Sequence, residues 1–472
     1  MVEGFYILGC VENRIMNETL ASRMRCTRWI GECPESGHRK LLRATNGRNR
    51  HQHASPLQSA VRKPPMFRRD QYSSRTLSCI ASSTSEEVDI ASPSSSSQSH
   101  QLNESTAMSV SSKLDENISC TIDFASERGI AITDTSLVFE QTTSSSSNPL
   151  LTSKHVGKVR DSYVLSDGRV IIITTDRQSA FDRVLASVPF KGQVLNETSA
   201  FWMRETEHIM KNALIDVIDH NVSVMENCSP LPIEFIVRQY ATGSTNTSLW
   251  THYKSGSRNY CGHTLPEGIV KNAKLPEAIV TPTTKSDDGD CLISGEEIIA
   301  RGVLSSDQWQ FLEKKCLELF QFGSEQSKAR GLILVDTKYE IGTNKNGEFV
   351  LIDEVHTPDS SRFWIASSYL ERQSRGVEPE SIDKEFFRLW FKERCDPYAF
   401  NKSQAHLFPV APSSLVSELA KRYVYLQEQI TGQKVNLPHL LGNEAESYDP
   451  RERIAQNVGS YLNLHVTVDK NS

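Results

Sequence analysis

Leu332-Ile-Leu-Val-Asp336-Thr-Lys338-Tyr-Glu340 begins as aliphatic sequence and then places a charged residue at every second position. Side chains two residues apart on a β-strand project to the same face, about 6.8 Å from one another. The spacing therefore predicts a buried strand with Asp336, Lys338 and Glu340 on one face. Such a face suits a phosphate-bound cation held among carboxylates and an ammonium group. A solvated edge strand with ion pairs is the alternative that this segment alone leaves open.

A second strand is predicted over 348–354, joined to the first by a turn that contains Asn346-Gly347. This strand ends in two acids, Asp353 and Glu354, and further polar residues follow directly. Acidic side chains gathered at one end of a hairpin are costly unless they are paired or bound to a metal. The hairpin therefore favours a site for a Mg²⁺-nucleotide.

The segment 232–240 predicts another strand, with Glu234 and Arg238 on one face. It leads into Gly243-Ser244, which we expect to begin a helix. The free backbone N–H groups of a helix start, together with a serine hydroxyl, can hold a phosphate. An ordinary helix cap would use the same residues, so this motif alone leaves both interpretations open.

Gly157-Lys158 and Arg160 precede a predicted hairpin whose turn is Ser166-Asp167-Gly168. A glycine turn with two cations at this place could lie over nucleotide phosphates. The chain contains neither GxxxxGK[ST] nor GxGxxG, so neither a Walker loop nor a dinucleotide-binding fold is predicted.

The order of the predicted elements indicates an α+β protein, because strands and helices come in blocks and do not alternate. Apolar periodicity predicts further elements along the chain. These are helices over 197–211, 306–330, 384–394 and 414–430, and strands over 163–165, 169–175, 215–224 and 233–240.

The first 80 residues differ from the rest, with 14 basic against 6 acidic side chains in a chain of net charge −6. Arg-rich and Ser-rich sequence of this kind is typical of a mitochondrial or chloroplast transit peptide. We expect a cleavable, disordered transit peptide over 1–80 and a Ser-rich linker over 81–115; a tail without a targeting role is the alternative. The mild net charge predicts no nucleic-acid partner. The sequence has no apolar run of about 18 residues, so no membrane span is predicted.

Seven motifs, taken in order, resemble the phosphoribosylaminoimidazole-succinocarboxamide synthase (SAICAR synthetase) family. The resemblance runs from about His155 to about Tyr398, and the sequence after Trp364 is more similar to the longer fungal and plant-type members. The motifs are Gly157–Asp161, Thr175–Asp182, Phe190–Gly192, Glu234–Ser244, Thr281–Lys285, Leu334–Glu340, and Asp353-Glu354 with Thr357–Trp364.

The resemblance implies an ATP-dependent ligase that joins L-aspartate to carboxyaminoimidazole ribotide (CAIR) through an acyl phosphate, with Mg²⁺ as cofactor. It implies ATP contacts at Gly157, Lys158, Arg160 and Glu234, and Mg²⁺ ligands at Glu340 and Asp353. These two acids, Lys338 and Lys285 would be catalytic. CAIR or aspartate would contact Arg238, Ser244, Asp359, Ser361, Arg362, Asp176, Ser179, Asp182 and Lys191.

The family resemblance also implies a two-lobed fold with ATP in the cleft between the lobes, related to ATP-grasp and kinase-like arrangements. We expect a mainly β lobe over 116–240 and an α/β lobe with C-terminal helices over 241–472. Another ATP-dependent kinase or ligase is the competing enzyme class, and a nucleic-acid-binding protein using the basic first 80 residues is the non-enzymatic one. The serine bias and the plant-type resemblance favour the chloroplast stroma over the mitochondrion.

Overall fold

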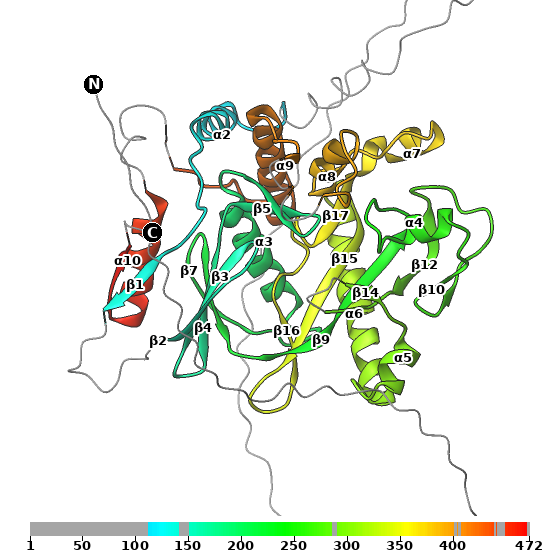
Figure 1. The fold of residues 1–472 in the computed structure, drawn as a ribbon, viewed down its shortest axis with the longest axis horizontal. Helices are drawn as coiled ribbons and strands as arrows, with labels where there is room; N and C mark the ends of the chain where they lie inside the picture. Colours follow the sequence, from blue (N-terminus) through cyan, green and yellow to red (C-terminus); the bar gives the residue numbers. More distant parts are fainter. Residues whose placement is uncertain are drawn as a thin grey trace, which may run out of the picture. The chain divides into compact units, whose positions relative to one another are not determined.

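The computed structural model describes residues 112–140, 151–285, 290–400, 404, 407–438, 440 and 449–469. The predicted transit peptide 1–80 lies outside these residues, as does most of the predicted linker 81–115. The described chain is an α+β protein in which two larger antiparallel sheets are flanked by helices (Figure 1). The predicted fold class is confirmed.

The first larger sheet has the strand order β2-β3-β4-β8-β7. Alternating burial along β3 places Tyr163 and Leu165 in the core, and the predicted turn at Gly168 leads into β4. The strand predicted over 215–224 is in fact two strands, because Asp219 accepts a hydrogen bond from the Asn221 N–H in a local turn that reverses the chain. The bounds are β2 Leu151–Val156, β3 Arg160–Leu165, β4 Arg169–Thr174, β7 Leu214–Asp219 and β8 Val222–Glu226.

The second larger sheet is built around two long antiparallel strands, β9 and β15. Their register sets Glu340 opposite Glu234 and Asp336 opposite Arg238, so the charged faces predicted for the two strands adjoin. Strands β16 and β17 pair with β15, β12 and β13 pair with β9, and β14 pairs with β13. The bounds are β9 Ser229–Tyr240, β12 Lys274–Val280, β13 Thr283–Thr284, β14 Cys291–Leu292, β15 Leu332–Thr343, β16 Phe349–Ile352 and β17 Ser361–Ile365.

Most predicted helices lie close to their expected positions. Helix α6 begins after a capping box formed by Ser305 and Gln308, and α9 ends at Gly432 with a φ of 70°. Helix α3 begins six residues before its predicted start, because the residue at its N-cap, Phe190, offers no side-chain cap that a sequence pattern could reveal. The bounds are α2 Glu116–Arg128, α3 Lys191–Thr206, α4 Leu249–Lys254, α5 Gly295–Ala300, α6 Ser306–Lys328, α7 Ala366–Ser374, α8 Glu385–Lys392, α9 Ser413–Thr431 and α10 Pro450–Leu462.

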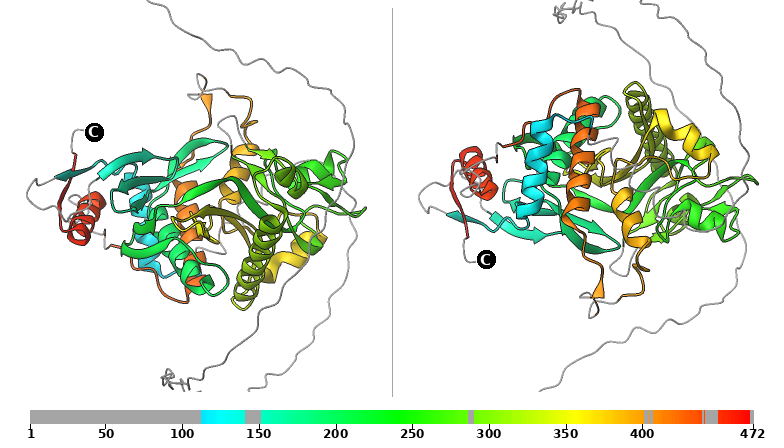
Figure 2. Two further views of the ribbon diagram at one scale, coloured as in Figure 1. Left: turned by 90° about the horizontal axis from the view of Figure 1, so that it is seen from below. Right: turned by 90° about the horizontal axis from the view of Figure 1, so that it is seen from above.

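The main core packs α3, α6 and α9 with the apolar residues of β9 and β15. Trp202 of α3, Leu312 of α6, Tyr423 of α9 and Phe235 of β9 are all almost fully buried there. Helix α2 packs beside α9, as the right view of Figure 2 shows. These helices fix the positions of the strands that carry the charged residues.

A second core lies against the five-stranded sheet and includes Ile171 of β4 and Ile454 of α10. Strand β1 (Leu137–Glu140) pairs there with β18 (His465–Val468), so segments from the two opposite parts of the sequence meet. Two further hairpins are β5 (Arg177–Ala180) with β6 (Arg183–Ser187), and β10 (Asn259–Tyr260) with β11 (His263–Thr264). Within the described ranges, no helix is long and apolar enough to cross a membrane.

The expected lobe boundary at residue 240 separates β9 from β15, although these strands are hydrogen-bonded along most of their length. In addition, α9 packs against α3, and α10 packs against β7. We propose a boundary before β9 instead, with the C-terminal helices α9 and α10 assigned to the first lobe. Sequence order could not reveal this arrangement, because the chain returns to the first lobe after completing the second.

Candidate active site

A cleft of about 840 Å³ is lined by residues of both larger sheets, of the β5–β6 hairpin and of the loop that follows β16. Most of the predicted site residues meet in it. These are Gly157, Lys158, Arg160, Ser179, Asp182, Glu234, Arg238, Lys338, Glu340, Asp353, Asp359, Ser361 and Arg362.

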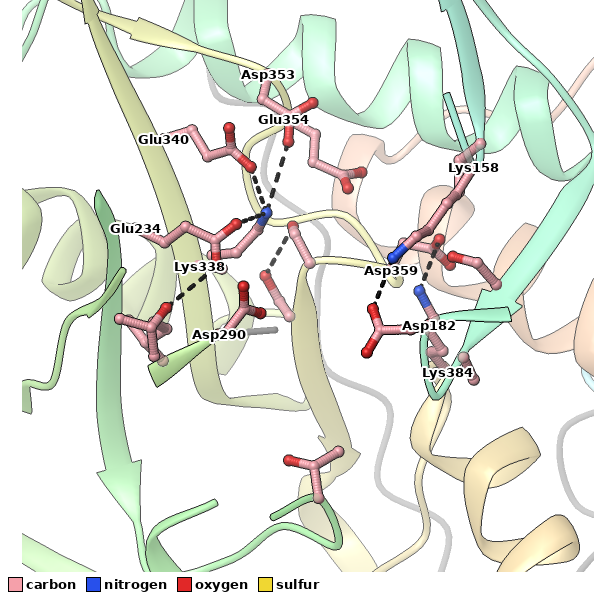
Figure 3. A pocket seen from close by; sticks show the side chains of 18 of the residues that line it. Lys158, Asp182, Glu234, Asp290, Lys338, Glu340, Asp353, Glu354, Asp359 and Lys384 are labelled. Carbon is pink, nitrogen blue, oxygen red and sulfur yellow. Dashed lines mark hydrogen bonds and ion pairs between the residues drawn. The ribbon is translucent and has the colours of Figure 1, made fainter. Parts of the chain in front are cut away.

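One part of the cleft is a cluster of three carboxylates around Lys338, which we call the Lys338 cluster (Figure 3). The Lys338 Nζ lies 2.9 Å from Glu234 Oε1 and 3.9 Å from Asp353 Oδ2, and it also contacts Glu340. Burial alone would lower the pKa of Lys338, but the three acids together raise it well above its usual value. Lys338 is therefore a permanent cation in the cleft.

Two more cations neutralise the same acids. Lys285 forms an ion pair with Glu340. Burial raises the pKa of the Glu340 carboxyl, but Lys338 and Lys285 together hold that pKa well below its usual range. Arg160 extends from β3 to Asp353 and lies 2.8 Å from Glu354. Burial raises the pKa of Asp353 to about 6 in spite of the nearby Arg160.

Two acids of the Lys338 cluster, Glu340 and Asp353, have the chemistry of Mg²⁺ ligands. Among the described residues no three histidine, cysteine or acidic side chains are arranged as a complete metal site. Mg²⁺ in phosphate-transfer sites usually takes only one or two carboxylates, and substrate phosphates and water complete its coordination. Glu340 and Asp353, which both line the cleft, supply that number.

A second part of the cleft is rich in arginine. Arg362 Nη1 lies 2.7 Å and Arg238 Nη1 lies 3.3 Å from the same Asp336 Oδ2 atom. Arg362 also pairs with Glu385 at 3.1 Å, and Arg388 lies beside that acid. The acids hold the guanidinium groups in place, and planar guanidinium groups suit the recognition of phosphate or carboxylate oxygens.

Asp359 also lines the cleft, and its carboxylate has three partners. Its carboxylate is 3.1 Å from Lys191 Nζ and 3.2 Å from Lys384 Nζ, and it accepts a hydrogen bond of 2.7 Å from the Tyr423 hydroxyl. Although burial opposes it, these lysines hold the pKa of Asp359 below its usual range. Burial lowers the pKa of Lys384 to about 8, against the pull of Asp359.

Four predicted site residues do not line the cleft: Lys285, Ser244, Asp176 and Lys191. Lys285 still contacts the site through its ion pair with Glu340. Lys191 is fully buried and forms an ion pair with Asp359. Asp176 is buried elsewhere and accepts hydrogen bonds from the N–H groups of Ile132 and Gly192. Its role in this structure is to join chain segments.

The predicted helix start at Gly243-Ser244 is wrong. Helix α4 begins at Leu249 after Ser248. Gly243 has a φ of 107°, and an added Cβ there would lie 2.4 Å from the Ser248 Cβ, so the glycine makes a tight turn. The Ser244 carbonyl accepts a hydrogen bond from Lys392. The following residues 245–247 line the cleft in its place.

A family model described as SAICAR synthetase matches residues 153–405, more than half of the chain. The chain belongs to the SAICAR synthetase family. The matched range contains every predicted site residue, including all members of the Lys338 cluster. The family resemblance drawn from the ordered motifs is therefore confirmed.

Relatives from plants and bacteria support this membership. A chloroplastic phosphoribosylaminoimidazole-succinocarboxamide synthase of Arabidopsis thaliana is 54% identical over 61% of this chain and 69% of the relative. The synthase of Legionella pneumophila (strain Paris) is 52% identical over 59% of this chain and 88% of the relative. A solved SAICAR synthase of Saccharomyces cerevisiae, complexed with SAICAR, is 29% identical with a TM-score of 0.51; it covers 64% of this chain and 100% of the yeast chain.

This SAICAR synthetase is therefore an ATP-dependent ligase that joins aspartate to CAIR in purine biosynthesis. The predicted enzyme class and reaction are confirmed, and the kinase alternative is not favoured. ATP is a substrate, and the other substrates are small molecules.

Sequence reasoning missed several residues of the SAICAR synthetase cleft: Asp290, Lys384, Arg388 and Tyr398. Lys384 and Arg388 are four residues apart at the start of α8, a spacing that places both on one helix face. From that spacing a cationic helix face could have been predicted. The sequence offers no comparable signal for Asp290 or Tyr398, which reach the cleft from irregular segments.

Proposed function

We propose that the ligation takes place in this cleft, with the ATP phosphates between the Gly157 loop and the Lys338 cluster. The ribotide phosphate of CAIR would lie beside Arg238 and Arg362. The observation that carries this proposal is the pairing of β15 with β9 and with β17, which sets Glu234, Lys338 and Glu340 on the same sheet as Arg238 and Arg362, and all five line the cleft.

The chemistry has two steps, both of which need charge to be neutralised. A carboxylate oxygen of CAIR attacks the γ-phosphorus of ATP, the bond to the bridging oxygen breaks, and ADP leaves. The aspartate amine then attacks the acyl carbon, loses a proton, and expels inorganic phosphate. Phosphoryl transfer is catalysed mainly by positioning and electrostatics, so the permanent charge of Lys338 suits the first step. Lys285 would stabilise the same region through Glu340.

Glu340 and Asp353 would hold Mg²⁺ together with ATP oxygens and water. The bound ion would supply further neutralisation of the phosphate charge. The chain's own contribution is to hold these carboxylates near Lys338, with Glu234 as the third acid.

Ser179, Asp182 and Ser361 line the cleft and are proposed substrate contacts. Lys191 and Asp176 are proposed to act through neighbours. Lys191 keeps the Asp359 carboxylate in place, and Asp176 fixes the start of α3 through the Gly192 N–H. Loss of either would disturb the shape of the cleft without removing a direct contact.

The first experiment is an assay of phosphate release by the purified chain with ATP, Mg²⁺, CAIR and aspartate, omitting each component in turn. We expect turnover to require all four. Asp353→Asn should lower kcat by about a hundredfold or more, because it removes a carboxylate from the Lys338 cluster. Asp216→Asn, at an exposed position of β7, is the matched control and should retain activity.

Phosphate release that proceeds without aspartate would contradict the ligase mechanism, because ATP would then be hydrolysed without formation of the amide bond. A fully active Asp353→Asn variant with unchanged dependence on Mg²⁺ would contradict the proposed metal site alone. The two results are distinguishable, since the first concerns the substrates of the wild type and the second concerns one side chain.

We also propose that the first 80 residues direct import into the chloroplast. Two similar synthases, from Arabidopsis thaliana and Vigna aconitifolia, are chloroplastic. The Arg-rich and Ser-rich composition of 1–80 supports an organelle address. The mitochondrion is the second choice.

A further inference from the structure

Arg177, the first residue of β5, connects three separate parts of the chain. Its guanidinium donates hydrogen bonds to the carbonyl oxygens of Gly157 at 2.9 Å, Lys158 at 3.3 Å and Thr133 at 2.6 Å. It also pairs with the Asp161 carboxylate at 2.6 Å. The side chain is almost fully buried, although the Gly157–Lys158 backbone that it holds lines the cleft.

The Gly157 loop is the turn between β2 and β3, closed by a hydrogen bond from the Gly157 N–H to the Arg160 carbonyl oxygen. Arg177 adds hydrogen bonds to the two carbonyl oxygens of the turn that face it. Strand β2, which leads into the loop, is exposed along most of its length. Lys158 pairs with Asp182, and both side chains are more than half exposed, so this ion pair constrains the loop only weakly. An added Cβ on Gly157 would lie 2.9 Å from the Arg160 carbonyl oxygen, which shows how closely the backbone folds on itself.

The third connection reaches residues outside the range matched by the family model. Thr133 lies between α2 and β1, ahead of residue 153, where that range begins. Thr135 of the same segment donates a hydrogen bond to the second Asp161 oxygen at 2.8 Å. Asp161 thus joins the segment to Arg177. The segment around 133–135 and the Gly157 loop are therefore held by one pair of charged side chains.

We propose that Arg177 is a positioning residue for the ATP phosphates: it fixes the backbone of Gly157 and Lys158 and anchors this loop to the segment around Thr133. The proposal rests on the proposed function, which places ATP phosphates at the loop. A guanidinium suits this role because its fixed fork of donors can satisfy several carbonyl groups at once, whereas a lysine ammonium would act as a single mobile charge.

The test compares Arg177→Ala and Arg177→Lys with the wild-type chain in steady-state kinetics, varying ATP, CAIR and aspartate separately. We expect the KM for ATP to rise about tenfold or more in Arg177→Ala, the size expected from the loss of charge-assisted hydrogen bonds that order the loop. The KM values for CAIR and aspartate should change much less. Arg177→Lys should show a smaller rise in the same parameter.

Two further measurements separate positioning from general destabilisation. Low concentrations of guanidine should lower the KM for ATP in Arg177→Ala and leave the wild type unchanged, because the free cation can occupy the vacated space. Arg169→Ala removes an arginine that pairs with Asp167 at the β3–β4 turn, away from the cleft. This control should leave the KM for ATP as in the wild type.

An unchanged KM for ATP in folded Arg177→Ala would overturn the proposal, and so would a uniform loss of affinity for all three substrates. If Arg177→Ala does not fold, Arg177→Lys decides by the same criterion. Wild-type turnover that does not require ATP or aspartate would instead refute the proposed function. The failure of the inference and the failure of the function therefore give different results.

Discussion

At the scale of single residues, His356 shows how deeply the cleft loop is anchored. Its side chain is fully buried against Trp202 and Tyr339. Burial lowers the pKa of His356 to about 3. The unfolded chain would protonate this histidine near pH 6.5. The unfolded state therefore binds one more proton than the folded state between about pH 3 and pH 6.5, and folding stability must fall as the pH falls through that window.

We expect this histidine alone to remove about 2 kcal/mol of folding stability between pH 7 and pH 5. His356→Asn should lower stability at pH 7 but lose less of it at pH 5, and asparagine tolerates the φ of 48° at this position. Urea unfolding midpoints at both pH values measure the difference. His208→Asn changes an exposed histidine and should show the wild-type loss. An equal loss in His356→Asn would contradict the prediction.

The sequence predicted which side chains share one face of a strand better than it predicted contacts between residues that are distant in sequence. Glu234, Arg238, Lys338 and Glu340 follow from a period of two, and the structure brings all four into the cleft. The partners of Asp359 could not be predicted in the same way, because Tyr423 is 64 residues away in sequence. Only the packing of α9 brings that hydroxyl to the loop.

At the scale of elements, the predicted helix boundaries were wrong where the sequence has no local capping signal. Helix α6 has a capping box and was predicted to begin at its observed first residue, Ser306. Helix α3 begins at Lys191 after an uncapped phenylalanine with a φ of 63°, so its first turn resembles a loop in sequence. At Gly243 a helix start was predicted where the structure has a tight turn. In sequence, a glycine in a tight turn resembles a glycine that precedes a helix.

Helix α2 contributes to the site indirectly, since it packs on α9, which carries Tyr423. Ile122 of α2 is fully buried in the main core. Ile122→Ala should therefore lower the free energy of unfolding by about 2–5 kcal/mol. Thermal unfolding checks the change, with Glu127→Ala on the exposed side of α2 as the control. Equal melting temperatures for Ile122→Ala and the wild type would show that α2 does not support the fold.

At the scale of the whole molecule, the range matched by the family model is shorter than the part of the chain that folds together. The match covers 153–405, yet α2, β1, α9, α10 and β18 all lie outside it or extend beyond it. Lys421 of α9 pairs with Asp123 of α2 at 2.7 Å, and β1 pairs with β18. The order of motifs predicted the family correctly, but it contained no information on how the segments before residue 153 and after residue 405 would pack on each other.

This closure limits where a targeting segment can be removed. Leu114 is buried in the main core, and Asp115 caps the first turn of α2. Cleavage after Asp115 would remove both, so we expect the processed chain to begin at or before Leu114. Import of the full chain into isolated chloroplasts, followed by mass spectrometry of the protected product, measures this terminus.

Isolated mitochondria provide the parallel experiment, and a chain lacking residues 1–80 is the control that should enter neither organelle. Protection in mitochondria alone would reverse the choice of organelle but keep the expected terminus, because the terminus follows from the packing of α2. A stable, active product that begins after Gly129 would contradict the structural argument itself. That outcome would mean that neither the α2–α9 contact nor the Asp123–Lys421 ion pair is needed to hold Tyr423 at Asp359.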